Sequence, residues 1–179
     1  MQKIDLEKLN RKNFKALMSA LSMPGNIKKI SPLYKSAMLA LSNVLLYNEV
    51  TYFFAGDDNI SLVADITNPK IETAQNADYI FSDQIDKDLL EIAKKGTFLN
   101  PEFSATLIFA CKDFNKTKAK ISGPGIKEEK EIYLPCEREF IQTLTEKNSN
   151  YPLGIEVFFI NEKNELMALS RTTKIEVVS

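Results

Sequence analysis

The hydrophobic pattern near the start of the chain predicts an amphipathic helix. Apolar residues recur there at positions i, i+3, i+4 and i+7, which lie on one side of an α-helix. This apolar face comprises Phe14, Leu17, Met18 and Leu21. The pattern leaves the start open, because either Asp5 or Asn13 could cap the helix. Pro24-Gly25 predicts its end, since proline blocks propagation and glycine tolerates a left-handed turn.

A second helix is predicted to begin with Ser31 as its N-cap and Pro32 at its first helical position. Its expected buried residues are Leu33, Met38, Leu41, Val44 and Leu45. Two later stretches have the same periodicity, Ile85–Lys95 and Glu137–Lys147. In the first of these we expect Gly96 at the C-terminal cap, with the apolar side formed by Leu89, Leu90 and Ile92. The apolar side of the second comprises Phe140, Ile141 and Leu144.

Short β-rich runs separate these helices. The run Ala105–Ala110 is apolar throughout, which predicts a central strand buried on both faces. A hairpin is predicted over the turn Asn161–Asn164. Other predicted strands are Val50–Phe54, Ala77–Ser82, Lys118–Ser122, Glu129–Leu134, Ile155–Ile160, Leu166–Leu169 and Lys174–Val178. The stretch Ile60–Ile66 fits either a short helix, capped by Asp58 or Asn59, or a strand.

The order of these elements predicts a single α/β domain over residues 1–179. We expect a three-layer sandwich in which helices flank a mixed sheet. The 23 Lys and Arg residues nearly balance the 24 Asp and Glu residues, so the composition argues against a nucleic-acid or anionic-membrane binder. No apolar run approaches the roughly 18 residues of a membrane span. Cys111 and Cys136 match no metal-ligand spacing and are expected to be reduced and buried. These features favour a cytoplasmic protein.

The chain contains no histidine, which removes the commonest nucleophile pairs and zinc sites. Catalysis by this chain alone would therefore depend on carboxylates, Lys, Tyr or Cys. Glu128, Glu129 and Glu131 alternate with lysines along a predicted strand, and this pattern favours a solvated face over an acid–base pair.

Two stretches remain as candidate binding or interface residues. Gly123-Pro124-Gly125 could cradle an anion, although Pro124 lacks an N–H group and no helix is predicted after it. A tight connection between strands is the favoured interpretation. Arg171, Thr172 and Thr173 follow an apolar strand directly, and the planar fork of arginine matches a carboxylate or a phosphate. These hydrogen-bonding groups could form a structural turn or a binding surface.

Several of these stretches together resemble the PhnH subunit family of the bacterial carbon–phosphorus lyase core complex. The resemblance extends from Phe14 to Val178. It is carried by NFKALMSALSMPG (13–25), PEFSATLI (101–108), SGPGI (122–126), YPLGIE (151–156) and LSRTT (169–173). Pro124 stands where a small residue is common in the family, and Ser170 stands where a proline is common.

This resemblance implies a role in phosphonate catabolism and association with PhnG-, PhnI- and PhnJ-type subunits. The complex would transfer a phosphonate to the ribose of ATP with displacement of adenine. The family's fold is similar to the large domain of fold-type-I pyridoxal-phosphate transferases, without their cofactor site. We accordingly expect no cofactor, no metal and no catalytic residue in this chain, and a homodimer when it is isolated. The alternative is a stand-alone enzyme that transfers a phosphoryl or glycosyl group on a nucleotide, with Arg171 and the Gly123–Gly125 loop as its binding residues.

Overall fold

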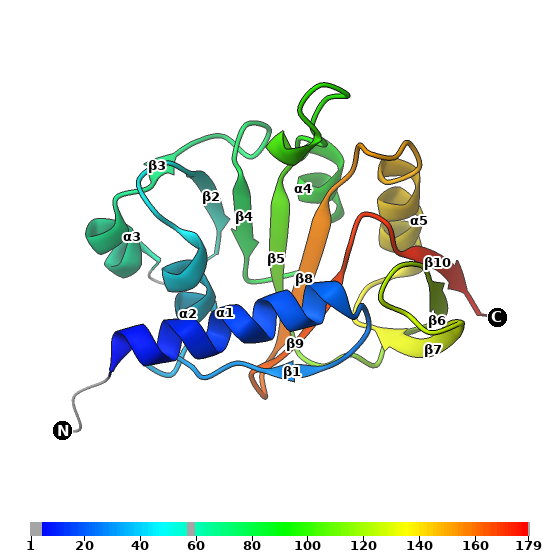
Figure 1. Ribbon diagram of the computed structural model, residues 1–179, viewed down its shortest axis with the longest axis horizontal. Helices are drawn as coiled ribbons and strands as arrows, with labels where there is room; N and C mark the ends of the chain where they lie inside the picture. The colour runs from blue at the N-terminus through cyan, green and yellow to red at the C-terminus, as the bar shows by residue number, and fades with distance from the viewer. Residues whose placement is uncertain (1–4, 57–59, 179) are drawn as a thin grey trace.

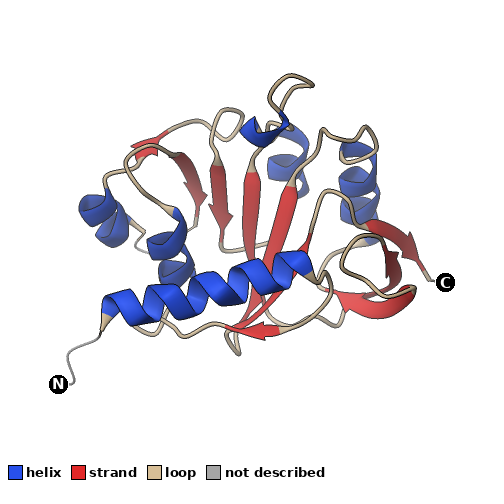
Figure 2. Cartoon of the chain, viewed as in Figure 1, coloured by secondary structure: helices blue, strands red, loops and turns tan. Residues whose placement is uncertain are grey.

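A computed structural model of the chain describes residues 5–56 and 60–178. Its helices are α1 (Leu6–Ser22), α2 (Ala37–Leu45), α3 (Ser61–Thr67), α4 (Lys87–Ile92), η1 (Pro101–Phe103) and α5 (Arg138–Lys147). Its strands are β1 (Lys28–Lys29), β2 (Thr51–Ala55), β3 (Lys70–Ile71), β4 (Tyr79–Ser82), β5 (Thr106–Cys111), β6 (Thr117–Ser122), β7 (Glu129–Leu134), β8 (Glu156–Asn161), β9 (Glu165–Leu169) and β10 (Lys174–Val177). Figures 1 and 2 show their arrangement.

The main sheet has seven strands in the order β1-β9-β8-β5-β4-β2-β3, and a separate small sheet has the order β10-β6-β7. Strands β3, β2, β4, β5 and β8 run parallel, whereas β9 and β1 form an antiparallel continuation at one side. After β2 the chain moves outward to β3, and then returns across β2 to β4 and β5. Parallel crossovers are right-handed. This reversal therefore places α3, which follows β2, and α4, which follows β4, on opposite faces of the sheet.

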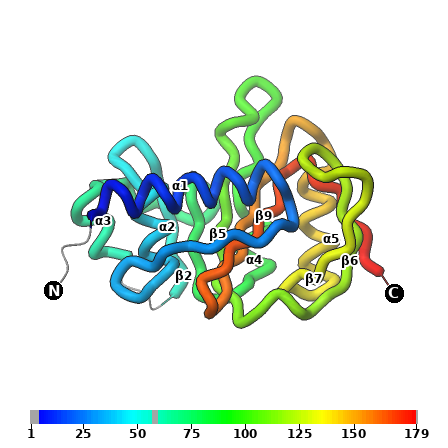
Figure 3. Tube along the Cα trace, turned by 60° about the horizontal axis from the view of Figure 1, so that its bottom comes forward, coloured from blue at the N-terminus to red at the C-terminus, as the bar shows by residue number. Residues whose placement is uncertain are grey.

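Two hydrophobic clusters confirm this arrangement. Along β5, Leu107 and Phe109 belong to the cluster that includes α4, α5 and the small sheet, whereas Ile108 faces α1, α2 and α3. All three side chains are fully buried, so β5 is the central strand, buried on both faces, that the sequence predicts. Figure 3 shows α1 crossing one face of the sheet. The predicted mixed sheet flanked by helices is therefore confirmed.

Helix α1 starts at the earlier of the two predicted positions. Asp5 is its N-cap, and its carboxylate accepts a hydrogen bond from the Lys8 N–H at 3.1 Å. The predicted apolar face is only partly buried, because Phe14 and Met18 keep 50% and 49% of their surface exposed. Asn13 lies inside the helix and its side chain is fully buried.

The predicted start of the second helix is wrong. Helix α2 begins at Ala37, with Ser36 as its N-cap. Tyr34 and Lys35 both have positive φ and form a tight reverse turn, which prevents a helix from starting at Pro32. Ser31 is held by Asn13 instead: its N–H donates to the Asn13 side chain and its carbonyl accepts from the Asn13 amide, both at 2.9 Å.

Some smaller expectations also need correction. Helix α4 ends at Ile92 with Ala93 as its cap, so Gly96 lies beyond the helix, and Ile92 is exposed. The two-residue strands β1 and β3 were not predicted. For Ile60–Ile66 the helical alternative is confirmed by α3, while Asp58 and Asn59 lie outside the described residues. The remaining predicted strands are present, and β10 pairs with β6 in the small sheet.

Candidate functional site

The turn Ser170–Thr173, between β9 and β10, contains three of the candidate residues. The Thr173 N–H donates to the Ser170 carbonyl at 2.9 Å. The Ser170 hydroxyl is also hydrogen-bonded to the Thr173 hydroxyl at 2.9 Å and to the Thr172 hydroxyl at 3.1 Å. Both threonine hydroxyls therefore stabilise the turn itself.

The Arg171 side chain is directed into the fold. Its Nε and Nη2 groups donate to the two carboxylate oxygens of Glu156 at 2.7 and 2.8 Å. Nη1 donates to the carbonyl oxygens of Pro101 at 2.8 Å and Pro152 at 3.2 Å. Nη2 also donates to the Ser104 hydroxyl at 2.7 Å. These contacts use all five N–H donors of a guanidinium group.

The environment of this arginine strengthens its ion pair. The Arg171 and Glu156 side chains are only 18% and 16% exposed. The hydrogen bonds that Arg171 donates to the Glu156 carboxylate raise the pKa of the Arg171 guanidinium above its ordinary value, although burial opposes this shift. The bidentate pair joins the start of β8 to the C-terminal turn. Arg171 thus locks the C-terminal strand in place, and a direct role in binding stays a prediction.

The glycine loop lies against the same turn. A Cβ atom at Gly123 would lie 2.7 Å from the carbonyl oxygen of Thr172, and one at Gly125 would lie 2.0 Å from that of Ser22. Both glycines have positive φ. The structure therefore brings Gly123 next to Thr172, and it uses Gly125 to contact the end of α1. This geometry matches the interpretation as a tight connection between β6 and β7.

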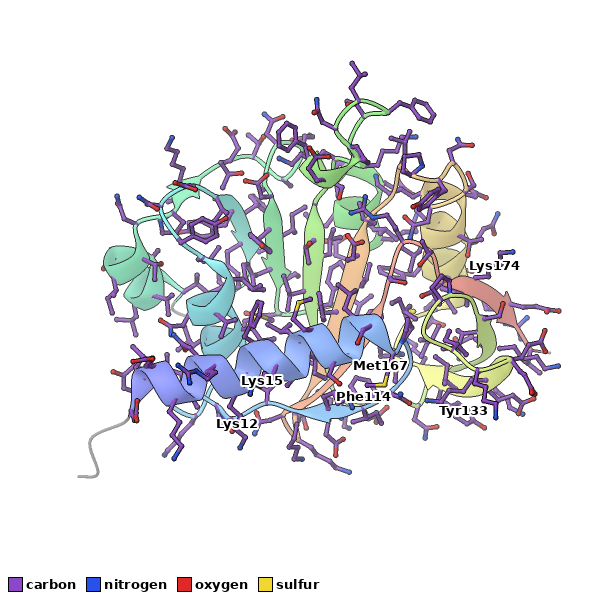
Figure 4. The ribbon with its side chains drawn as sticks, in the orientation of Figure 1. Lys12, Lys15, Phe114, Tyr133, Met167 and Lys174 are labelled. Atoms are coloured by element: carbon purple, nitrogen blue, oxygen red, sulfur yellow. The ribbon has the colours of Figure 1, made fainter. Side chains whose placement is uncertain are left out.

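A cavity of about 420 Å³ opens beside the C-terminal turn. It is lined by Thr145, Asn148, Ser149, Tyr151 and the segment 171–175. Several of its polar groups are already bonded within the chain: the Thr145 hydroxyl donates to the Ile141 carbonyl, and the Asn148 amide donates to that of Ile155. Lys174 begins β10 at its edge (Figure 4). The cavity is large enough for a small chemical group. Few hydrogen-bond donors of its lining are left without a partner inside the chain.

A larger crevice, of about 620 Å³, lies where β4, β5 and β8 end, and the sequence analysis missed it. Its charged lining residues are Asp83, Lys112, Asp113, Lys116 and Glu162. Cys111 also lines it and is only partly buried, so the expectation of a buried residue is wrong for Cys111 and confirmed for Cys136. Burial, with a smaller contribution from Asp113, raises the pKa of the Cys111 thiol to about 12. The polar residues that directly follow these strands could have indicated the crevice in the sequence. Ligands of parallel sheets bind at the carboxyl ends of the strands.

The glutamates that alternate with lysines form ion pairs on the surface of the small sheet. Lys118 Nζ lies 2.7 Å from a carboxylate oxygen of Glu131. Lys120 Nζ lies 4.0 Å from Glu129. A solvated face is therefore confirmed. Within the part of the chain that the structure covers, no three Asp, Glu, Cys or His side chains are grouped so as to hold a metal ion. None of the helices there has the length and apolarity that a membrane crossing requires.

Comparison with known proteins identifies the family. The model of the bacterial phosphonate metabolism protein (PhnH) family matches residues 5–176. The chain belongs to the PhnH family. It is also similar to the putative C-P lyase subunit protein HtxG of Stutzerimonas stutzeri, with 25% identity over 172 residues, which cover 92% of this chain and 84% of the relative. This protein therefore has a role in bacterial phosphonate metabolism.

The family match includes both candidate stretches, the Gly123–Gly125 loop and the C-terminal turn. The contacts of Arg171 cannot be read from the sequence. Its partners Pro101, Ser104, Pro152 and Glu156 stand 15 to 70 positions away along the chain. Only folding brings these segments together.

Proposed function

We propose that this protein is a subunit of a carbon–phosphorus lyase core complex. In this role it supports the transfer of a phosphonate to the ribose of ATP, with displacement of adenine. The observation that carries the proposal is the family match over residues 5–176. The similarity to a protein named as a putative C-P lyase subunit supports it further.

The charges of the two cavities support an accessory role over independent catalysis. A nucleotide triphosphate needs concentrated positive charge. The crevice of about 620 Å³ has two lysines, Lys112 and Lys116, against three carboxylates, and Lys116 pairs with Glu137 at 2.8 Å. In the cavity of about 420 Å³, Arg171 is fully bonded within the chain. Neither lining favours a polyanion.

The proposed partners are PhnG-, PhnI- and PhnJ-type subunits. Co-expression with tagged partners tests this association: we expect the chain to co-purify with them through gel filtration at constant stoichiometry. Elution of the chain as a separate species, with the partners assembled, would contradict the proposal. We further propose a fold similar to the large domain of fold-type-I pyridoxal-phosphate transferases, without their cofactor site.

The isolated chain is expected to form a homodimer. Large apolar residues are exposed at several places, including Phe14 and Met18 on α1, and such patches favour association. Light scattering at micromolar concentration should therefore give about twice the chain mass of 20.3 kDa. A constant monomer mass over the accessible concentration range would count against this prediction.

A further inference from the structure

The loop between α4 and β5 extends beyond the rest of the molecule in Figures 1 and 3. We call the segment Thr97–Phe103 the apolar arm. Three large hydrophobic side chains stand on it, Phe98, Leu99 and Phe103, which are 70%, 90% and 62% exposed. Tyr151, on the neighbouring segment, is also exposed.

The arm is ordered by its own hydrogen bonds. The Thr97 N–H donates to the Asn100 carbonyl at 3.2 Å, and the Asn100 N–H donates to the Thr97 hydroxyl at 3.1 Å. The Phe103 N–H also donates to the Asn100 carbonyl at 3.3 Å. A preformed loop loses little conformational entropy when it binds. The arm is therefore suited to docking without prior folding.

Arg171 and Gly96 fix the base of the arm. Arg171 donates to the Pro101 carbonyl and to the Ser104 hydroxyl, on either side of Phe103. Gly96 has positive φ, and a Cβ atom there would lie 2.7 Å from the carbonyl oxygen of Pro101. The arginine of the C-terminal turn thus holds the exposed apolar residues in a defined position.

The apolar area that the arm exposes is comparable to the largest apolar patch of a typical monomer, and such patches are often functional. An aromatic side chain presents about 150–250 Å². The three apolar side chains of the arm therefore expose on the order of 400 Å². A standard interface uses about 800 Å² from each partner, so the arm must bind together with the surface around its base.

The base of the arm carries positive charge. Lys95 precedes the arm, and Lys147 ends α5 nearby, where its ammonium group donates to the Glu91 carbonyl at 2.7 Å. Burial, and to a smaller extent the charge of Lys95, lower the pKa of Lys147. One exposed carboxylate, that of Glu102, lies within the arm, so the lysines outnumber the acidic side chains there. A carboxylate-bearing surface complements this excess of positive charge.

We propose that the apolar arm is the docking element of this chain and inserts into an apolar, acid-rimmed socket on another subunit of the complex. This inference rests on the proposed function and names the surface that performs it. Aromatic side chains, phenylalanine among them, are enriched in protein–protein interfaces. The lysines at the base would then pair with the acidic rim and orient the arm.

The test measures the affinity of the full chain for the assembled PhnG-, PhnI- and PhnJ-type subunits. The arm variant carries Phe98→Ser and Leu99→Ser. The matched control carries Ile66→Ser and Ile71→Ser, at positions that are 74% and 79% exposed on α3 and β3. We expect the arm variant to bind about 100-fold more weakly, which corresponds to about 2.8 kcal/mol, and the control to change by less than about threefold. Melting temperatures of both should stay within about 2 °C of the unaltered chain, because the altered side chains are exposed.

A second variant tests the acidic rim. Lys95→Glu should weaken binding about tenfold at low ionic strength, and the loss should shrink in high salt. Unchanged affinity of the arm variant overturns the inference. A second outcome also overturns it: the unaltered chain is dimeric, the arm variant is monomeric, and the variant still binds the partners normally. The arm would then bind a second copy of this chain. If the unaltered chain binds no partner, the proposed function fails, and the inference fails with it.

Discussion

At the scale of single residues, Arg171 joins segments that are far apart in the sequence. Its guanidinium pairs with Glu156 and bonds to Pro101, Ser104 and Pro152. Arg171→Ala would leave the largely buried Glu156 carboxylate without its partner. We expect a loss of about 3 kcal/mol in the free energy of unfolding, measured by urea titration.

Two further variants make this prediction specific. Arg171→Lys keeps the charge but loses the planar fork, so its cost should be intermediate. Arg11 is exposed and pairs with Glu7 within one turn of α1, and Arg11→Ala should cost less than about 0.5 kcal/mol. If Arg171→Ala cost as little free energy of unfolding as Arg11→Ala, the hydrogen bonds of Arg171 would not stabilise the fold.

The two cysteines are expected to be unreactive in the folded protein. Burial is the main cause that raises the pKa of Cys111 and of Cys136 to about 12. Thiolate is the reactive form, so at pH 8 labelling should be roughly a thousandfold slower than for a free thiol of pKa 8.5. The rate should rise about tenfold per pH unit towards pH 12, while the fold persists. Mass spectrometry before and after unfolding measures this, and rapid labelling of the native chain at pH 8 would refute it.

At the scale of secondary-structure elements, the glycine loop connects the small sheet to the end of α1. Gly125 approaches the Ser22 carbonyl so closely, at positive φ, that a side chain has no space. Gly125→Ala should therefore lower the free energy of unfolding by at least about 2 kcal/mol. The control Pro124→Ala alters the same loop without adding a Cβ atom and should cost about 1 kcal/mol or less. Equal effects of the two changes would argue against this packing.

Hydrophobic patterns within short stretches of the sequence correctly predicted most helices and strands. The run Ala105–Ala110 is apolar apart from Thr106, and most of it lies in the buried central strand β5. The start of α2 was predicted wrongly for two reasons. Leu33 and Ser36 close a tight turn at Tyr34 and Lys35 by mutual backbone hydrogen bonds, and Asn13 of α1 holds Ser31 outside the helix. Helical spacing likewise predicted the amphipathic character of α1, but not that Phe14 would stay exposed.

The candidate site was predictable only in part. The sequence indicated that Arg171 and the glycine loop are unusual, since their residue types have special hydrogen-bonding and conformational properties. It could not indicate that Gly123 lies against Thr172, or that Arg171 holds the base of the apolar arm, because these contacts join distant segments. The arm itself gave no periodic signal, since Phe98 and Leu99 lie in a loop.

At the scale of the whole molecule, the chain combines a buried α/β core with exposed apolar surface in several places. Phe98 and Leu99 on the arm, and Phe14 and Met18 on α1, are large hydrophobic residues in contact with solvent. Such exposure is typical of proteins that function in association with others. Together with membership of the PhnH family, this exposure fits the proposal that the chain acts as a subunit of a phosphonate-processing complex.

The most direct test of this account is the release of adenine from ATP in the presence of methylphosphonate. Three mixtures are compared: this chain alone, PhnG-, PhnI- and PhnJ-type subunits alone, and all of them together. The account predicts no adenine release above background by the chain alone, and a rate in the full mixture that exceeds that of the partners alone by about tenfold or more. Adenine release by the isolated chain at the rate of the full mixture would contradict it.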